Sequence, residues 1–158
     1  MNRDATPPSR AAMLILKLVR LRAQRLALWQ QLLWQSGNAS PDQGLAITAA
    51  EVARLLHPEE VAAQEASLYI QDESAVALGA AIATTEAALA ADEGWSKFRD
   101  GFALDSAESD FLALMIAVEL DPGLQRVLAY LHDDSRQSHP TAHLSERLAG
   151  RTIPSPFA

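Results

Sequence analysis

Residues 9–35 read SRAAMLILKLVRLRAQRLALWQQLLWQ, and the apolar residues recur at the spacing of one helix face. That face is wide because two apolar stripes run beside each other, namely Leu14, Leu18, Leu21, Leu28 and Leu32 next to Ile15, Val19, Leu26, Trp29 and Leu33. The sequence predicts one long helix here, closed by the glycine and asparagine of residues 36–38 and followed by a loop. We expect the helix to be buried by its own domain, with self-association or binding to a membrane surface as alternatives.

The rest of the chain is punctuated as a series of shorter helices. A capping box at Thr48 and Glu51 predicts a helix over residues 49–56, and Pro58 begins an alanine-rich helical stretch to residue 91 with a break near 71–72. Small residues in that stretch favour close helix contacts, among them Ala77, Gly79, Ala80, Ala81 and Ala83. Later helices are expected over residues 95–104, from a capping box at 105–108, over 121–131, and over 140–150.

These patterns favour a mainly α fold. The helix that follows residue 108 is apolar around nearly its whole circumference, so we expect it at the domain centre. No stretch alternates apolar and polar residues for long enough to predict a sheet, and residues 45–47 or 152–153 provide a minor edge strand or hairpin at most. With 158 residues and 49% hydrophobic content, the chain is large enough for one domain with its own core.

Charge and composition restrict the function. Residues 1–25 hold six basic residues and one acidic one, whereas residues 26–158 hold seven basic and nineteen acidic ones, so most of the chain should repel nucleic acid. The absence of cysteine excludes disulfides, thiolate metal sites and cysteine nucleophiles. The first residues are polar, and the apolar segment that follows is interrupted by basic residues, which argues against a signal peptide and a membrane span. We expect a cytoplasmic protein.

No catalytic motif is present. None of the seven glycines is followed by lysine, so the GxxxxGK[ST] loop is absent, and neither GxGxxG nor GxSxG occurs. Paired carboxylates stand at Glu119 with Asp121 and at Asp133 with Asp134, but no arrangement of histidine, lysine or metal ligands supports acid–base work by them. Asp121 stands at an N-cap position, and Glu119 is expected to pair with Arg126. The sequence predicts no enzyme and no cofactor.

The histidines offer a weak metal pattern. His139 and His143 are four residues apart, with His132 and two aspartates upstream, and such spacing can place two imidazoles on one helix face. Pro140 places His139 at or before the helix start, so the two rings need not converge. We therefore predict exposed or capping histidines rather than a metal site.

Four residues are candidates for interaction with a partner. Trp34 lies near the end of the first helix, where an indole can serve as an interface anchor, whereas Trp29 and Trp95 are expected in the core. The other candidates carry basic or titratable side chains, namely Arg20, His143 and Arg147.

One segment resembles a known family. Phe102-Ala-Leu, Glu108, Glu-Leu-Asp-Pro at 119–122, Leu-Ala-Tyr-Leu-His-Asp-Asp at 128–134 and Pro-Thr at 140–141 follow one another in the order and spacing of a family pattern. The pattern resembles the winged-helix domain that precedes the ATPase module in bacterial AAA-type ATPases, including those encoded with contractile injection systems. Ala103 stands where glycine is common in that family, so we expect the turn before the central helix to differ.

The resemblance implies a non-catalytic N-terminal domain that recruits a protein partner or substrate, while ATP binding and hydrolysis take place in a module in cis after residue 158. The residue patterns predict a disordered start at 1–8, a helical segment at 9–92 and a linker-like tail at 151–158. The resemblance implies that residues 93–150 form a winged-helix-like segment, which we expect to pack with the helical segment as one domain. The alternatives are a stand-alone helical adaptor and a DNA-binding regulator, in which residues 121–131 and 140–150 would form a helix-turn-helix.

Overall fold

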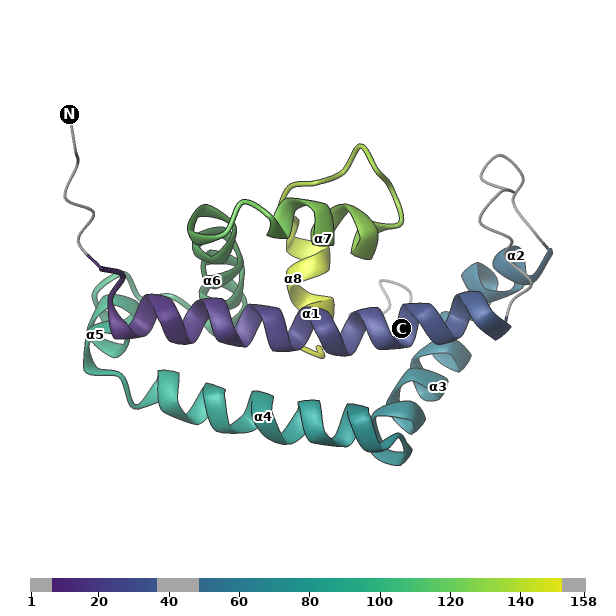
Figure 1. Cartoon of the computed structure of the whole chain (residues 1–158), viewed down its shortest axis with the longest axis horizontal. Coiled ribbons are helices and arrows are strands. Elements are labelled where there is room, and N and C mark those ends of the chain that lie inside the picture. Colours follow the sequence, from purple (N-terminus) through teal and green to yellow (C-terminus); the bar gives the residue numbers. More distant parts are fainter. Residues whose placement is uncertain (1–6, 37–48, 152–158) are drawn as a thin grey trace.

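The computed structural model describes residues 7–36 and 49–151, and this part of the chain forms eight helices and no strand (Figure 1). They are α1 (Arg10–Ser36), α2 (Ala49–Leu56), α3 (Pro58–Gln71), α4 (Glu73–Ala90), α5 (Glu93–Gly101), α6 (Ser106–Leu120), α7 (Leu124–His132) and α8 (Ala142–Leu148). The mainly α prediction is thereby confirmed. The predicted loop after α1, the cap at Thr48, both candidate strand segments, residues 1–6 of the predicted disordered start and residues 152–158 of the tail lie outside the described residues.

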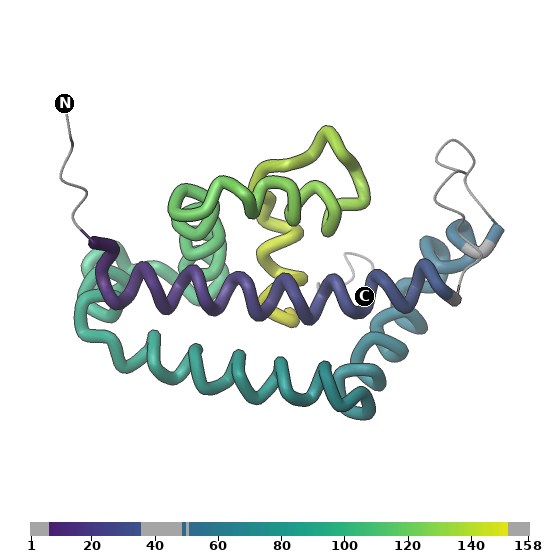
Figure 2. The backbone as a smooth tube through the Cα atoms, viewed as in Figure 1, coloured from purple at the N-terminus to yellow at the C-terminus, as the bar shows by residue number. Residues whose placement is uncertain are grey.

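Helix α1 is the spine of the molecule. Helix α4 lies along one side of it and runs in the opposite direction, while α6, α7 and α8 pack on its other side (Figures 1 and 2). Helix α5 joins α4 to α6 at one end, and α2 and α3 lie at the other. The expectation that the helix after residue 108 occupies the centre is wrong: Met115 and Leu120 of α6 are 45% and 39% exposed. Because other helices pack on two sides of α1, it is α1 that occupies the centre of the molecule.

The core confirms the predicted burial of the first helix. Its fully buried side chains include Ile15 and Leu26 of α1, and Trp29 and Trp95 are also buried, as expected. The residues of α4 that are buried recur every three or four positions, at Ala75, Ile82, Thr85 and Leu89. Ala77, Ala80 and Ala83 are exposed and face away from the core, so the small residues expected to mediate close contact are largely on the wrong face.

Side-chain caps separate the helices where the chain turns. The carboxylate of Asp72 accepts a hydrogen bond from the Ala75 amide at 2.9 Å, and this cap divides α3 from α4 near the predicted break. Asp92 caps α5 in the same way. At the start of α6, Asp105 and Glu108 form the predicted capping box. These caps satisfy amides that the first turn of a helix leaves unpaired.

The last two helices begin later than the sequence predicts. Helix α7 starts at Leu124 rather than residue 121, because Asp121 accepts a hydrogen bond from the Gly123 amide and holds residues 122–123 in a turn. Helix α8 is capped by Thr141, one residue after Pro140. Gly150 follows with a φ of +71°, which confirms it as the residue that ends the helix.

Within the described ranges, no single helix is long and apolar enough to cross a membrane, and only the bent pair α4 and α5, with 70° between them, meets that criterion jointly.

Ala103, between α5 and α6, has a φ of +51°, in the left-handed region that glycine enters without a steric penalty. The change Ala103→Gly should therefore raise the free energy of unfolding by about 0.5–1 kcal/mol, since relief of the strained backbone exceeds the entropy that glycine adds to the unfolded chain. Urea denaturation measures the difference.

Ala91 provides the matched control, because it is an exposed alanine that also follows a helix but has a right-handed φ of −81°. Ala91→Gly should give no stabilisation. Equal effects of the two substitutions would show that the backbone conformation at residue 103 carries no strain.

Candidate functional site

A cleft of about 310 Å³ opens between α1, α4, α5 and α6, beside Leu18 and Arg22 in the first half of α1. Residues from all four helices line it, together with Ala149 and Arg151 from the chain that follows α8. Its charged lining consists of three arginines and two carboxylates, namely Arg22, Arg99, Arg151, Glu86 and Asp110. Such a concentration of cations is unexpected in a chain with a net charge of −7.

Arg22 lies at the floor of this cleft and is 7% exposed. It interrupts the apolar side of α1, so its guanidinium is carried into the interior between α4 and α6. One terminal nitrogen donates to Asp110 Oδ1 at 2.9 Å and the other donates to Glu86 Oε1 at 2.8 Å. The Nε of Arg22 is buried without a hydrogen-bond partner. A single side chain thereby links three helices.

Asp110 holds a second arginine. Its other oxygen, Oδ2, accepts a hydrogen bond from Arg151, which also donates to the Ser106 carbonyl oxygen at 2.9 Å. The carboxylate is mostly buried, with 17% of its side chain exposed. The two guanidinium groups compensate its burial and fix the end of α8 against α6.

Arg99, on α5, differs from the other two arginines of the cleft. Its Nε is buried and has no hydrogen-bond partner, and within the described part of the chain its guanidinium takes part in no ion pair. With three guanidinium groups and two carboxylates, the lining carries a net charge of +1. The cleft therefore has one positive charge that its own carboxylates do not neutralise.

Aromatic side chains continue from the cleft onto the surface of α5. Trp95 is buried in the cleft wall and stacks on Phe98 with ring centroids 6.0 Å apart, and Phe98 contacts Phe102 at 4.8 Å. Phe98 is 42% exposed and Phe102 is 68% exposed. Trp95, Phe98 and Arg99 of α5 and Phe102, which directly follows the helix, have the i, i+3, i+4, i+7 spacing of one helix face. That spacing is the signal in the sequence for this surface.

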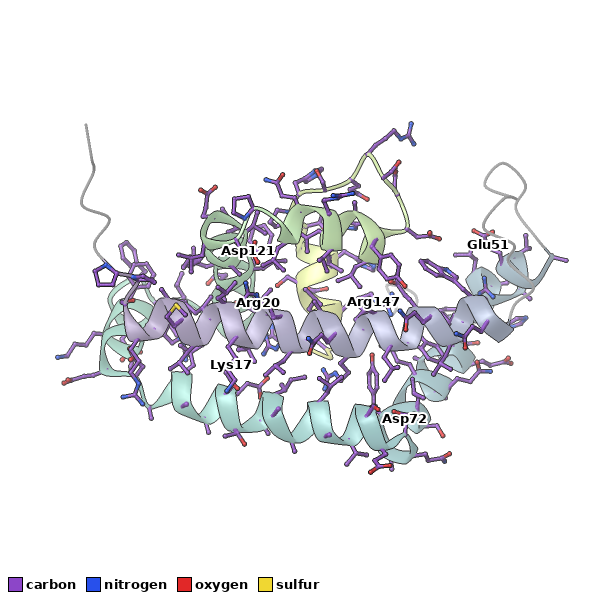
Figure 3. The ribbon with its side chains drawn as sticks, viewed as in Figure 1. Lys17, Arg20, Glu51, Asp72, Asp121 and Arg147 are labelled. Carbon is purple, nitrogen blue, oxygen red and sulfur yellow. The ribbon has the colours of Figure 1, made fainter. Side chains whose placement is uncertain are left out.

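Three of the four predicted interaction residues contact other parts of the fold, and Trp34 and Arg20 are the first two. Trp34 is partly buried and packs edge-on against Tyr130 with 4.8 Å between ring centroids. Arg20 donates to Asp121 at 2.8 Å, and the two side chains point toward one another in Figure 3. This hydrogen bond holds the pKa of the Asp121 carboxyl below its usual value.

His143 and Arg147 lie on α8, where they are separated by one helical turn. His143 is exposed, whereas Arg147 donates to Glu65 of α3 at 3.1 Å. Glu65 also accepts a hydrogen bond from Tyr69, whose pKa is raised by burial. No hydrogen bond, ion pair or ring contact in the described part of the chain joins any two of the four candidates, so they do not form one site.

The geometry of α8 argues against a DNA-reading helix. It has seven residues, and Leu144, Ser145 and Leu148 are buried. Its cation Arg147 and the following Arg151 are both paired with carboxylates of the same molecule, which leaves little positive charge for phosphate.

The histidines and paired carboxylates noted in the sequence make contacts of different kinds. His132 Nε2 lies 3.2 Å from the His139 carbonyl oxygen, and the described residues include no group of three potential ligands that could hold a metal. The expected pair between Glu119 and Arg126 is not formed, and both side chains are exposed. Asp133 and Asp134 differ too, because burial raises the pKa of the former while hydrogen bonds from Arg136 lower that of the latter.

Comparisons with models of protein families, with curated proteins and with solved structures found no match.

Proposed function

We propose that this chain is a non-catalytic protein-interaction domain that recruits a partner or substrate to an AAA-type ATPase. The observation that carries the interaction role is the surface of α5, where two exposed phenylalanines adjoin an arginine that has no partner among the described residues. Large aromatic side chains and arginine are the residue types that dominate protein interfaces. A helix that keeps them at its surface is suited to bind another protein.

The ATPase part of the proposal rests on the sequence resemblance over residues 102–141. One structural detail supports it. Although alanine replaces the family's common glycine at residue 103, and we expected a different turn for that reason, Ala103 adopts the backbone conformation that glycine favours. A winged-helix-like arrangement of residues 93–150 is part of the same proposal, and the succession of α6, α7 and α8 is compatible with it.

The test is to purify the native polypeptide from its source cell with an antibody raised against this chain, and to measure both its mass and its ATPase activity. We expect a product much larger than 17.1 kDa that hydrolyses ATP. Excess recombinant chain, added as a competitor of the antibody, should remove the activity from the purified material. A product of 17.1 kDa without ATPase activity would contradict the role in cis and leave the stand-alone adaptor.

A further inference from the structure

We propose that the arginine-lined cleft binds an acidic segment of a partner protein, in which a carboxylate enters beside Arg99 while a neighbouring apolar side chain packs on Phe98 and Phe102. This inference deepens the proposed function, on which it rests, by assigning the chemistry of the partner. The juxtaposition of one uncompensated guanidinium and an exposed aromatic surface on a single helix face is its basis.

The charges of the cleft select a carboxylate. Glu86 and Asp110 already satisfy the terminal nitrogens of Arg22, and Asp110 also binds Arg151, so Arg99 is the cation that remains for a ligand. A guanidinium binds a carboxylate through two parallel hydrogen bonds. One carboxylate would neutralise the net charge of +1, whereas a phosphate dianion would exceed it and approach two fixed negative charges.

The terminal nitrogens of Arg99 also favour an occupant that accepts hydrogen bonds. Arg99 Nε is closed to solvent, so a carboxylate that enters the cleft would meet the terminal nitrogens, which take part in no ion pair within the described part of the chain. Hydrogen bonds from a guanidinium to a carboxylate are assisted by charge, and a neutral acceptor would lack that contribution.

The aromatic row sets the second requirement. Phe102 and Phe98 together extend the apolar wall of Trp95 to the surface, so a partner side chain that leaves the cleft meets rings rather than water. A volume of about 310 Å³ is at the small end of ligand pockets, which suits one or two side chains. An acidic residue next to a large apolar residue meets both conditions.

N-acetyl-L-phenylalanine carries one carboxylate and one ring, and its neutral amide serves as the matched probe. Titration of the ¹⁵N-labelled full chain, followed by NMR, should show saturable shifts at α5 and at the Arg99 Nε–H for the acid, with a dissociation constant on the order of 1 mM. The amide should bind about tenfold more weakly or less, because it lacks the charge-assisted hydrogen bonds.

Arg99→Gln should weaken binding of the acid by about tenfold or more, and Arg99→Lys should retain part of it because the charge remains without the planar fork. Arg126→Gln is the control, since Arg126 is an exposed arginine outside the cleft with no ion pair in the described structure. The Arg126→Gln variant should bind the acid as tightly as the unchanged chain does. If Arg99→Gln proves unfolded by its amide spectrum, Arg99→Lys and Phe98→Ala carry the test, and both should bind the acid more weakly.

Three results would overturn the inference: equal binding of the acid and the amide, unchanged binding by the Arg99 variants, or tighter binding of inorganic phosphate at the same residues. None of these measurements involves an ATPase. A native ATPase with an inert cleft would therefore reject the inference alone, whereas a cleft that binds the acid in a stand-alone 17.1 kDa protein would reject only the ATPase role.

Discussion

Substitution of Arg22 by methionine is expected to lower the free energy of unfolding by about 3 kcal/mol. Its guanidinium is almost completely buried and joins Asp110 to Glu86, so removal of the cation leaves a mostly buried carboxylate with one partner fewer. The expected cost lies at the lower end of the range for broken buried ion pairs, because Asp110 keeps Arg151 and Glu86 is exposed enough to turn toward water. Urea denaturation followed by circular dichroism measures the loss.

Arg136→Met is the matched control for this substitution. Arg136 also pairs with an aspartate, Asp134, but its side chain is 90% exposed. Exposed pairs contribute less than about 1 kcal/mol, so the control should change the unfolding midpoint little. Similar effects for the two methionine variants would mean that the contacts of Arg22 do not stabilise the fold.

Replacement of Leu26 by alanine should destabilise the protein by about 2–5 kcal/mol. Leu26 is 1% exposed on α1, the helix that packs against both sides of the molecule, and alanine would leave a cavity there that neighbouring helices cannot easily fill. Thermal and urea unfolding both report the change.

Leu55→Ala removes the same atoms from a leucine that is 71% exposed on α2. Its effect should stay within about 0.5 kcal/mol. A small loss for Leu26→Ala, comparable to that for Leu55→Ala, would contradict the central position of α1.

Local features of the fold were predictable because they depend on neighbouring residues. The capping box at Asp105 and Glu108, the bounds of α2 and the helix end at Gly150 follow from side chains within a few positions of one another. The central position of α1 was not predictable in this way. Its apolar face and that of α6 look equally suited to burial, and only the packing of α4 on the opposite side of α1 distinguishes them.

The cleft was not predictable from the sequence for a similar reason. Arg22 and Asp110 are 88 residues apart, and Arg22 and Glu86 are 64 apart, so nothing local indicates that they meet. The sequence makes Arg20 a candidate for contact with a partner, but its guanidinium pairs with the carboxylate of Asp121, which is 101 residues away in the sequence. The charge of a helix face can be counted from the sequence, but whether each charge is already paired depends on contacts made by distant elements.

Helix α1 is made long before the residues that it contacts in the finished molecule. Gln30 of α1 donates to the Leu131 carbonyl oxygen at 2.8 Å, across 101 residues of sequence. At about 5–20 residues per second, a ribosome needs roughly 5–20 s to make that interval. During this time α1 presents its wide apolar face without most of the helices that later cover it. The element that organises the finished molecule is therefore also the one most exposed to misassociation while the molecule is being made.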